Sequence, residues 1–327
     1  MANTFTYGGQ AVIEGVLIVG RTGASLAVRR PDGGIWTGRL SMSPLIRGRL
    51  GRTPLVRGVV VLLGTLALGI RALNRSAEIA MVAPDAPGGE AEDVPAPGRV
   101  ERGAIYGSMV AAVALGVGVF FLLPLLGARA LDRVIESSLV SNLLEGMIRL
   151  VMLVSYIWLI GRLGDIKRVF AYHGAEHMTI HAHEHGEPLE PDRIRAFPKA
   201  HPRCGTAFLI TVVVVSILVF SIVGRPALWL AALSRIALVP VIAAISYELI
   251  RFAGTHPGNP LARVLSLPGL AFQAMTTRVP NDDQIEVAVA AMSRALADDA
   301  GPIVETDAAS SPNGATPPND AASGDAT

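Results

Sequence analysis

The sequence predicts a mainly α-helical, polytopic membrane protein with about four spans, a re-entrant or interfacial helix and a small N-terminal β-rich unit. Of the 327 residues, 51% are hydrophobic and only 17% are charged, whereas a soluble protein averages about a quarter charged residues. The apolar residues gather in long runs, which indicates that lipid is the solvent for much of the chain. Short alternating segments between turn-forming residues predict the β-rich unit.

Residues 1–42 make up this β-rich unit. Residues 24–30 and 35–40 are typical of two strands joined by the turn signal Pro31-Asp32-Gly33-Gly34. Upstream, Glu14 interrupts an otherwise apolar segment. Its carboxylate is expected either to face solvent or to contact a group that requires a negative charge.

Residues 43–82 combine a basic segment with an apolar stretch. Only 13 residues separate Arg57 from Arg71, and stretches of about 10–14 residues more often lie in the interface or re-enter than cross. We therefore expect an interfacial or re-entrant helix, although crossing by residues 58–73 stays an open alternative. Residues 83–103 are rich in proline, glycine and acidic residues, which is typical of a flexible linker.

Residues 104–255 form the predicted four-span core. The clearest span has no charged residue over 23 positions. The second carries Glu145 and Arg149 on one helix face, where the two charges can neutralise each other. Arg235 is expected to snorkel outward or to pair inside the bundle, and Pro240 to kink the fourth helix. The spans are predicted at residues 104–126, 143–160, 205–224 and 227–247.

Residues 256–298 form a C-terminal segment that contains an amphipathic helix. Apolar residues recur at helical spacing between residues 284 and 296. The preceding Asn281, Asp282 and Asp283 provide a helix start. Residues 299–327 are mostly alanine, proline, aspartate, serine and glycine, so we expect a disordered tail.

The distribution of basic residues predicts the orientation in the membrane. The region up to Arg57 and the loop of residues 164–206 are both rich in arginine or lysine, and such regions stay in the cytoplasm. Four crossings place both regions there if residues 58–70 do not cross. We therefore expect a multi-pass protein with both termini cytoplasmic and the lipid bilayer as its partner.

The loop of residues 164–206 is rich in histidine. If it is helical, His173, His177 and His181 share one face. His173, Glu176 and His177 follow the H-x-x-E-H order of the inverted zincins, in which the histidines bind zinc and the glutamate acts as a general base. We therefore predict a divalent metal, with zinc as the first choice, bound by His173 and His177. A solvated loop that binds metal adventitiously is the alternative.

His201 and Cys204 stand directly before the third span. Their spacing suits zinc or iron, and a helix start beside Cys204 favours a thiolate. A single cysteine excludes an internal disulfide. Cys204 is therefore a metal ligand, a nucleophile or an inert buried thiol, and His201 is a ligand or a capping residue.

Glu248 lies near the cytoplasmic end of the fourth span. It is either a further ligand or base at the membrane edge, or the partner of Arg251 three residues later. Glu14, the histidine-rich loop and Glu248 all fall on the predicted cytoplasmic side. These groups can therefore converge although they are far apart in sequence.

Five segments in order resemble those of one known family: YGGQAVIEGV from Tyr7, HGAEH from His173, HPRCGT from His201, YELIR from Tyr247 and DDQIEV from Asp282. Together they resemble the YqhQ-like bacterial membrane protein family, a domain-of-unknown-function family described as a predicted metal-dependent enzyme. The resemblance covers roughly residues 5–297 and implies a bacterial inner membrane protein. It also implies functional groups at Glu14, His173, Glu176, His177, His201, Cys204 and Glu248.

We expect a metal-dependent membrane enzyme, such as a hydrolase that acts on a lipid or a membrane-proximal substrate at the cytoplasmic leaflet. Glu176 is the expected base, and Cys204 a ligand or, in a variant of this hypothesis, the nucleophile. The alternative is a non-catalytic scaffold or metal-responsive regulator with a closed His/Cys site. Transport ranks last, because no pair of broken helices recurs in two halves. No nucleic-acid partner is expected, and the sequence indicates no oligomeric state.

Overall fold

The computed structural model of the chain describes residues 6–43, 46, 48–81, 107–108, 110–112, 114–116, 118–131, 135–224, 226–256 and 258–300. The protein is mainly helical and has a small N-terminal β unit, as the sequence predicts. This unit is a four-stranded antiparallel sheet, which has two strands more than the two that the sequence indicates. The predicted linker of residues 83–103 and the tail beyond residue 300 lie outside the described residues.

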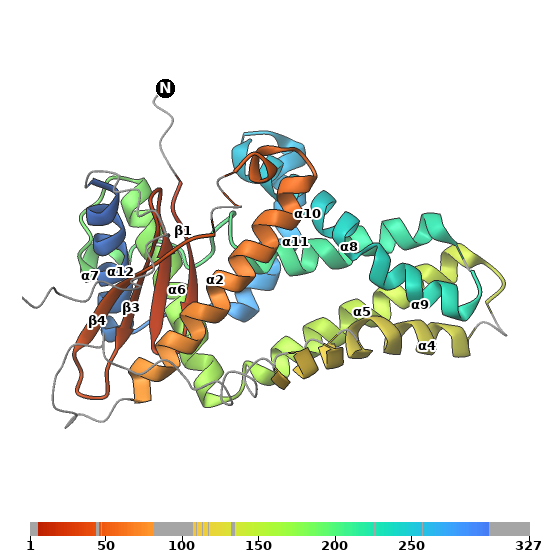
Figure 1. Ribbon diagram of the computed structural model, residues 1–327, viewed down its shortest axis with the longest axis horizontal. Coiled ribbons are helices and arrows are strands. Elements are labelled where there is room, and N and C mark those ends of the chain that lie inside the picture. The colour runs from red at the N-terminus through yellow and green to blue at the C-terminus, as the bar shows by residue number, and fades with distance from the viewer. Residues whose placement is uncertain are drawn as a thin grey trace, which may run out of the picture.

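The sheet is an antiparallel meander in the order β1-β2-β3-β4 (Figure 1). Two residues connect β1 to β2, and one of them, Glu14, has a φ of +50°. Gly33, with a φ of +86°, supplies the positive dihedral that the turn between β3 and β4 requires. The strands are β1 (Gly8–Val12), β2 (Gly15–Val19), β3 (Ala24–Arg29) and β4 (Ile35–Leu40).

Both faces of the sheet are covered by helices, so its central strands are buried on both sides (Figure 1). Successive side chains of a strand point to opposite faces. Val16, on one face, packs with α6 (Gly164–Glu184) and α12 (Asp282–Ala300). Leu17, on the other face, packs with α2 (Val56–Met81). The N-terminal sheet, α6 and the C-terminal helix therefore share one core.

Helix α12 is the predicted amphipathic helix and is capped as the sequence indicates. Asn281 Oδ1 accepts a hydrogen bond from the Gln284 amide (3.1 Å), and Gln284 Oε1 accepts one from the Asn281 amide (3.0 Å). This reciprocal pair satisfies donors that have no partner within the helix. The apolar face that follows is buried against the sheet and α6.

The C-terminal end of α12 is tied to the sheet. Asp299, which we expected at the start of a disordered tail, accepts hydrogen bonds from the amides of Arg21 and Thr22, both at 2.7 Å. Tyr7 also donates its hydroxyl proton to Asp299 (3.0 Å). Burial, together with this contact, raises the pKa of Tyr7 to about 12. The helix therefore extends to Ala300 because these donors satisfy the carboxylate of Asp299.

Several apolar helices in the described part of the chain are long enough to cross a membrane, and α9 with α10 form a further candidate bent by 44°. Pro240 stands in the first turn of α10, where its missing amide donor explains the predicted kink. The candidates are α2, Val110–Ala130, α5 (Ser138–Ile160), α8 (Thr206–Val223) and the pair α9 (Leu228–Ala237) and α10 (Val239–Thr255).

Helix α2 is longer than we expected. It comprises 26 residues, whereas the apolar stretch between Arg57 and Arg71 has 13. Arg71 and Arg75 do not end it, since both find partners in the sheet unit. Arg71 donates to the Ser41 carbonyl at 2.8 Å, and the guanidinium of Arg75 lies 5.5 Å from the centre of the Trp36 ring. The C-terminal half of α2 thus lies along the sheet.

Helix α11 (Pro260–Thr276) has no counterpart in the sequence interpretation. It begins at the Asn259 cap, which accepts a hydrogen bond from the Leu261 amide at 2.8 Å. Gly269 lets it approach α8 closely, because a Cβ there would lie 2.6 Å from the Ala207 Cβ. The described residues also contain the short helices η1 (Leu50–Arg52), η2 (Gly118–Leu122), α4 (Leu123–Ala130) and α7 (Pro191–Ile194).

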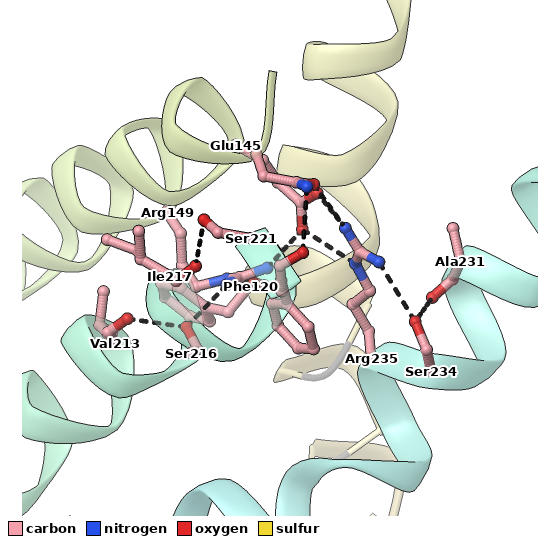
Figure 2. Close-up of polar contacts among 12 residues, drawn as sticks. Phe120, Glu145, Arg149, Val213, Ser216, Ile217, Ser221, Ala231, Ser234 and Arg235 are labelled. Atoms are coloured by element: carbon pink, nitrogen blue, oxygen red, sulfur yellow. Dashed lines mark hydrogen bonds and ion pairs between the residues drawn. The ribbon is translucent and has the colours of Figure 1, made fainter. Parts of the chain in front are cut away.

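A buried charge cluster joins α5, α8 and α9 (Figure 2). Glu145 accepts hydrogen bonds from Arg149 (2.8 Å) and Arg235 (2.6 Å). Other donors of Arg149 reach the Ser216 hydroxyl (2.9 Å) and the Phe120 carbonyl (3.0 Å). Glu145 and Arg149 pair as predicted, and Arg235 pairs inside the bundle. Two guanidinium groups share one carboxylate, so the cluster carries one surplus positive charge.

Candidate metal centre

Helix α6 carries the histidine stripe. We expected a polar loop over residues 164–206, but its first half is a 21-residue helix. The helix lies beside α12 on the sheet (Figure 1), and this contact buries its middle. His173 is 7% exposed and His177 is 1% exposed. Buried imidazoles require partners, and here the partners come from the segments around residues 200 and 276.

The segment His201–Cys204 faces this stripe and is held by α11. Gln273, which is fully buried, accepts a hydrogen bond from the His201 amide and donates one to the His201 carbonyl, both at 2.8 Å. Sequence reasoning missed Gln273, whose one signal is a polar residue within an apolar helix. Its amide fixes the backbone that leads into Cys204.

His173, His177 and Cys204 form a three-ligand group. One potential ligand atom from each residue lies within 4.8 Å of the others, and all three side chains are buried. The Nε2 of His173 is 3.1 Å from the Cys204 sulfur, and the two imidazole ring centres are 4.4 Å apart. Two imidazoles and one thiolate suit zinc, and three protein ligands leave a fourth tetrahedral position for another molecule.

The second nitrogen of each imidazole is fixed by the backbone. His173 Nδ1 lies 2.9 Å from the Thr276 carbonyl, and His177 Nδ1 lies 2.7 Å from the Lys199 carbonyl. A carbonyl only accepts, so these contacts assign the proton to Nδ1 and leave the Nε2 lone pair for a metal. Burial lowers the pKa of His177, which keeps this ring neutral, as a metal ligand must be.

The sulfur of Cys204 has donors directed toward it. The Thr206 amide donates to it at 3.3 Å, and the Thr206 hydroxyl lies 3.1 Å away. Both groups belong to the first residue of α8, where the helix dipole also favours negative charge. These donors are placed to stabilise the negative charge that the sulfur would carry when bound to a metal.

A second group of potential ligands lies next to the first. Its atoms, from His181, Glu184 and His201, also lie within 4.8 Å of one another. Arg203 pairs with Glu184, and His201 Nε2 is 3.5 Å from the same carboxylate. Burial would raise the pKa of Glu184, but His201 and Arg203 lower it overall. The structure thus places His201, a predicted metal ligand, in an ion-pair network beside the centre.

Glu176 is not one of the three grouped ligands, and its carboxylate lies against β1. It is 3% exposed, and a Cβ at Gly9 would lie 2.7 Å from its Oε1. Burial raises the pKa of Glu176 to about 7, and the charge of His173 acts in the opposite direction. The glycine pair of the YGGQ segment therefore makes room for a buried carboxylate next to His173.

Glu14 lies outside the three-ligand group, and its carboxylate contacts the N-terminal half of α6. Its carboxylate accepts a hydrogen bond from Arg168 Nε (2.6 Å) and one from the Tyr172 hydroxyl (3.2 Å). The hydrogen bond from Arg168 holds the pKa of Glu14 below its usual 4.5. The residue therefore ties the β1–β2 turn to α6.

Replacing Glu14 by glutamine is expected to lower the apparent unfolding temperature modestly at neutral pH, because a partly exposed pair contributes up to about 1 kcal/mol. The folded-state pKa is depressed, so the stabilisation is complete above the usual pKa of 4.5 and is lost as the pH falls through the lower folded-state value. Unfolding temperatures of the wild type and the variant should therefore converge in acid. A difference that persists or grows in acid would contradict this role.

Glu248 also lies apart from the three-ligand group. It accepts hydrogen bonds from Arg57 Nε (2.7 Å) and from the Leu55 amide (3.2 Å). Its hydrogen-bond partner is thus Arg57, at the start of α2, rather than Arg251. The pair joins α10 to α2 and has no place in the three-ligand group.

Gly174, in the HGAEH segment, has no room for a side chain. A Cβ there would lie 2.0 Å from the carbonyl oxygen of Arg278. The Arg278 amide in turn donates to the Phe170 carbonyl at 2.8 Å. This close approach positions the neighbouring Thr276 carbonyl against His173.

We expect Gly174→Ala to weaken zinc binding by about 10- to 100-fold, the range for lost outer-shell support. The added methyl group must displace the segment that carries the Thr276 carbonyl. Competition with a chromophoric chelator measures the affinity. Gly164→Ala, at a position with nothing within 4 Å of the added Cβ, is the matched control, and equal affinities in the two variants would contradict the argument.

Comparison with known proteins identifies the family. The family model "Protein of unknown function (DUF1385)" matches residues 53–298. The uncharacterized protein YqhQ of Bacillus subtilis (strain 168) is 30% identical over 299 residues, which cover 89% of this chain and 92% of that protein. No solved structure matches the chain. These matches confirm the resemblance carried by the five sequence segments, and the chain belongs to the YqhQ-like family described as DUF1385.

Proposed function

We propose that this chain is a metal-dependent membrane enzyme whose cofactor is zinc, bound by His173, His177 and Cys204. One observation carries the proposal. Both imidazoles use Nδ1 on a backbone carbonyl and turn Nε2 toward the same thiol. Metal-bound histidines almost always have this outer-shell support, in which the other ring nitrogen donates to a carbonyl or a carboxylate.

Hydrolysis is the reaction class that this ligand set supports best. When bound, zinc would act as a Lewis acid toward an ester, amide or phosphoryl oxygen. Glu176 is a buried carboxylate next to His173, so we assign it the general base. We assign Cys204 as a ligand rather than a nucleophile, because its sulfur lies within 4.8 Å of a nitrogen of both His173 and His177.

The folding of the chain supports a position for the centre at one membrane face. The sheet, α6 and α12 share a core, so all three must lie on the same side of a bilayer. Three candidate spans, α2, Val110–Ala130 and α5, separate the sheet from α6, and only an even number of them can cross. Since α2 lies along the sheet, we assign the crossings to the other two, followed by α8 and the α9–α10 pair.

This arrangement has four crossings and places both termini with the centre. The basic residues of the N-terminal region and of residues 164–206 favour the cytoplasm for that side. With a bacterial relative, we propose the inner membrane as the location. The substrate would then be a lipid or another molecule that reaches the cytoplasmic leaflet.

Cobalt-substituted protein prepared without a histidine tag tests the reaction class. An open coordination position accepts azide and changes the cobalt absorption spectrum, whereas a site closed by four protein ligands does not. We expect azide to change the spectra of wild type and Glu176→Gln alike. Hydrolytic activity is measured on a bacterial polar lipid extract, with the products identified by mass spectrometry. We expect the wild type to hydrolyse a lipid of the extract and Glu176→Gln to lose this activity. A spectrum that azide leaves unchanged would contradict the proposed enzyme.

A non-catalytic scaffold or regulator is the second candidate, and the position of His201 favours it. Its ring centre lies 5.6 Å from that of His177, so it is close enough to become a fourth ligand after a rotation. A closed four-ligand site is typical of structural zinc. In that case His201→Ala should weaken zinc binding as strongly as His177→Ala does.

A further inference from the structure

An open groove of about 560 Å³ lies where α5 ends and the chain leaves α11. One wall is apolar and includes Trp158, which is 54% exposed, and Val279, which is 78% exposed. An exposed tryptophan in the last turn of a candidate span is typical of the membrane–water interface. The remaining lining residues are Ile157, Gly161, Lys199, Ala274, Met275, Thr277 and Arg278.

The polar wall of the groove is cationic. Lys199 and Arg278 line it and donate to backbone carbonyls, at 3.2 and 3.0 Å. Arg162 stacks on Trp158, with its guanidinium carbon 3.5 Å from the ring centre. Within the part of the chain that the structure describes, none of these three cations contacts a carboxylate, and no lining residue is acidic. The groove is therefore lined by two cations, with Arg162 beside it on Trp158, and this positive charge is complementary to an anionic ligand.

The groove and the metal centre share a stretch of backbone. The Lys199 carbonyl accepts the hydrogen bond from His177, and the Thr276 carbonyl accepts the one from His173. Lys199 itself lines the groove, and so does Thr277, the residue that follows Thr276. A molecule in the groove thus lies against the residues that hold the two imidazoles.

We propose that this groove binds the headgroup of an anionic phospholipid. The phosphate would contact Lys199, Arg278 and Arg162, and the first part of the acyl chains would lie along Trp158 and Val279. A free phosphate ion needs the cations but not the apolar wall, whereas a lipid at the interface uses both. Assigning this lipid as the substrate rests on the proposed function, but the binding itself does not.

Quenching of Trp158 fluorescence by brominated lipid tests the proposal. In a Trp36→Phe/Trp229→Phe background, Trp158 is the sole tryptophan of the chain. Brominated phosphatidylglycerol and phosphatidylcholine are titrated separately into detergent-solubilised protein. We expect at least a threefold preference for phosphatidylglycerol, and we expect Lys199→Gln/Arg278→Gln to remove the preference. Arg193→Gln, an exposed arginine on α7, is the matched control and should keep it.

Equal quenching by the two lipids would overturn the proposal. So would quenching that inorganic phosphate at millimolar concentration displaces completely, because the site would then serve a soluble anion. If the background with two tryptophans replaced does not fold, native mass spectrometry of the wild type and of Lys199→Gln/Arg278→Gln measures retained phosphatidylglycerol instead. Loss of retention in the variant supports the proposal, and equal retention overturns it.

The metal content of every variant is measured in the same samples. The substitutions change side chains and leave the Lys199 and Thr276 carbonyls in the backbone. Selective lipid binding without bound metal would therefore reject the proposed enzyme and keep the lipid site. Bound metal without lipid selectivity would reject the lipid site alone.

Discussion

Replacing Glu145 by alanine is expected to destabilise the helical bundle by about 3–5 kcal/mol, the range for breaking a buried ion pair. The substitution removes the carboxylate that Arg149 and Arg235 share and leaves two guanidinium charges among apolar helices. Each arginine is only 1–2% exposed, so water cannot replace the lost partner. The apparent unfolding temperature in detergent, followed by circular dichroism, measures the effect.

The control is Glu136→Ala, which removes an exposed carboxylate just before α5 and should change stability little. A triple variant, Glu145→Leu/Arg149→Met/Arg235→Met, extends the test. It removes the whole network, and replacing all charges by apolar residues is often neutral or stabilising. We therefore expect the triple variant to be more stable than Glu145→Ala. The opposite order would show that the surplus charge is not what makes the single substitution costly.

Replacing His177 by alanine is expected to lower zinc affinity by more than about 100-fold, because losing a direct ligand exceeds the 10- to 100-fold effect of losing outer-shell support. The ring is 1% exposed and its two nitrogens face the Lys199 carbonyl and the Cys204 sulfur. The alanine side chain has no atom that can coordinate the metal. Chelator competition on untagged protein provides the dissociation constants.

His185→Ala is the matched control for this prediction. His185 lies two turns further along the same histidine-rich sequence, is exposed, and contacts the His181 carbonyl. Its removal should leave zinc affinity within about twofold, since exposed substitutions away from a site have small effects. If both variants bind zinc like the wild type, the metal is held elsewhere or adventitiously.

The sequence predicts the parts of the fold that depend on local pattern. The β3–β4 hairpin follows from alternation and turn residues, and α12 follows from its cap and its apolar stripe. Strands β1 and β2 were not predicted individually. The length of α2 could not be predicted, because Arg71 and Arg75 are satisfied by Ser41 and Trp36 of the sheet unit. Helix α11 was missed because Pro268 stands inside it, and an internal proline normally argues against a continuous helix.

In the candidate site, too, local sequence patterns predict some contacts and not others. His173 and His177 share a face by helical periodicity, so sequence alone brings them together. The acceptors on their Nδ1 atoms are backbone carbonyls of Thr276 and Lys199, and a backbone carbonyl has no residue signature. Glu248 was predicted on the same side of the membrane as the histidine-rich segment, but its carboxylate contacts Arg57. The two residues are 191 positions apart, and no local sequence pattern predicts such a pair.

X-ray absorption at the zinc edge of untagged, purified protein tests the central claim most directly. We predict about one zinc per chain, with one sulfur at about 2.3 Å, two imidazole nitrogens at about 2.0 Å and one further light atom in the coordination shell. The sulfur should be absent from the shell in Cys204→Ser. A wild-type shell without sulfur, or protein that is fully folded with no bound metal, would contradict a centre built from His173, His177 and Cys204.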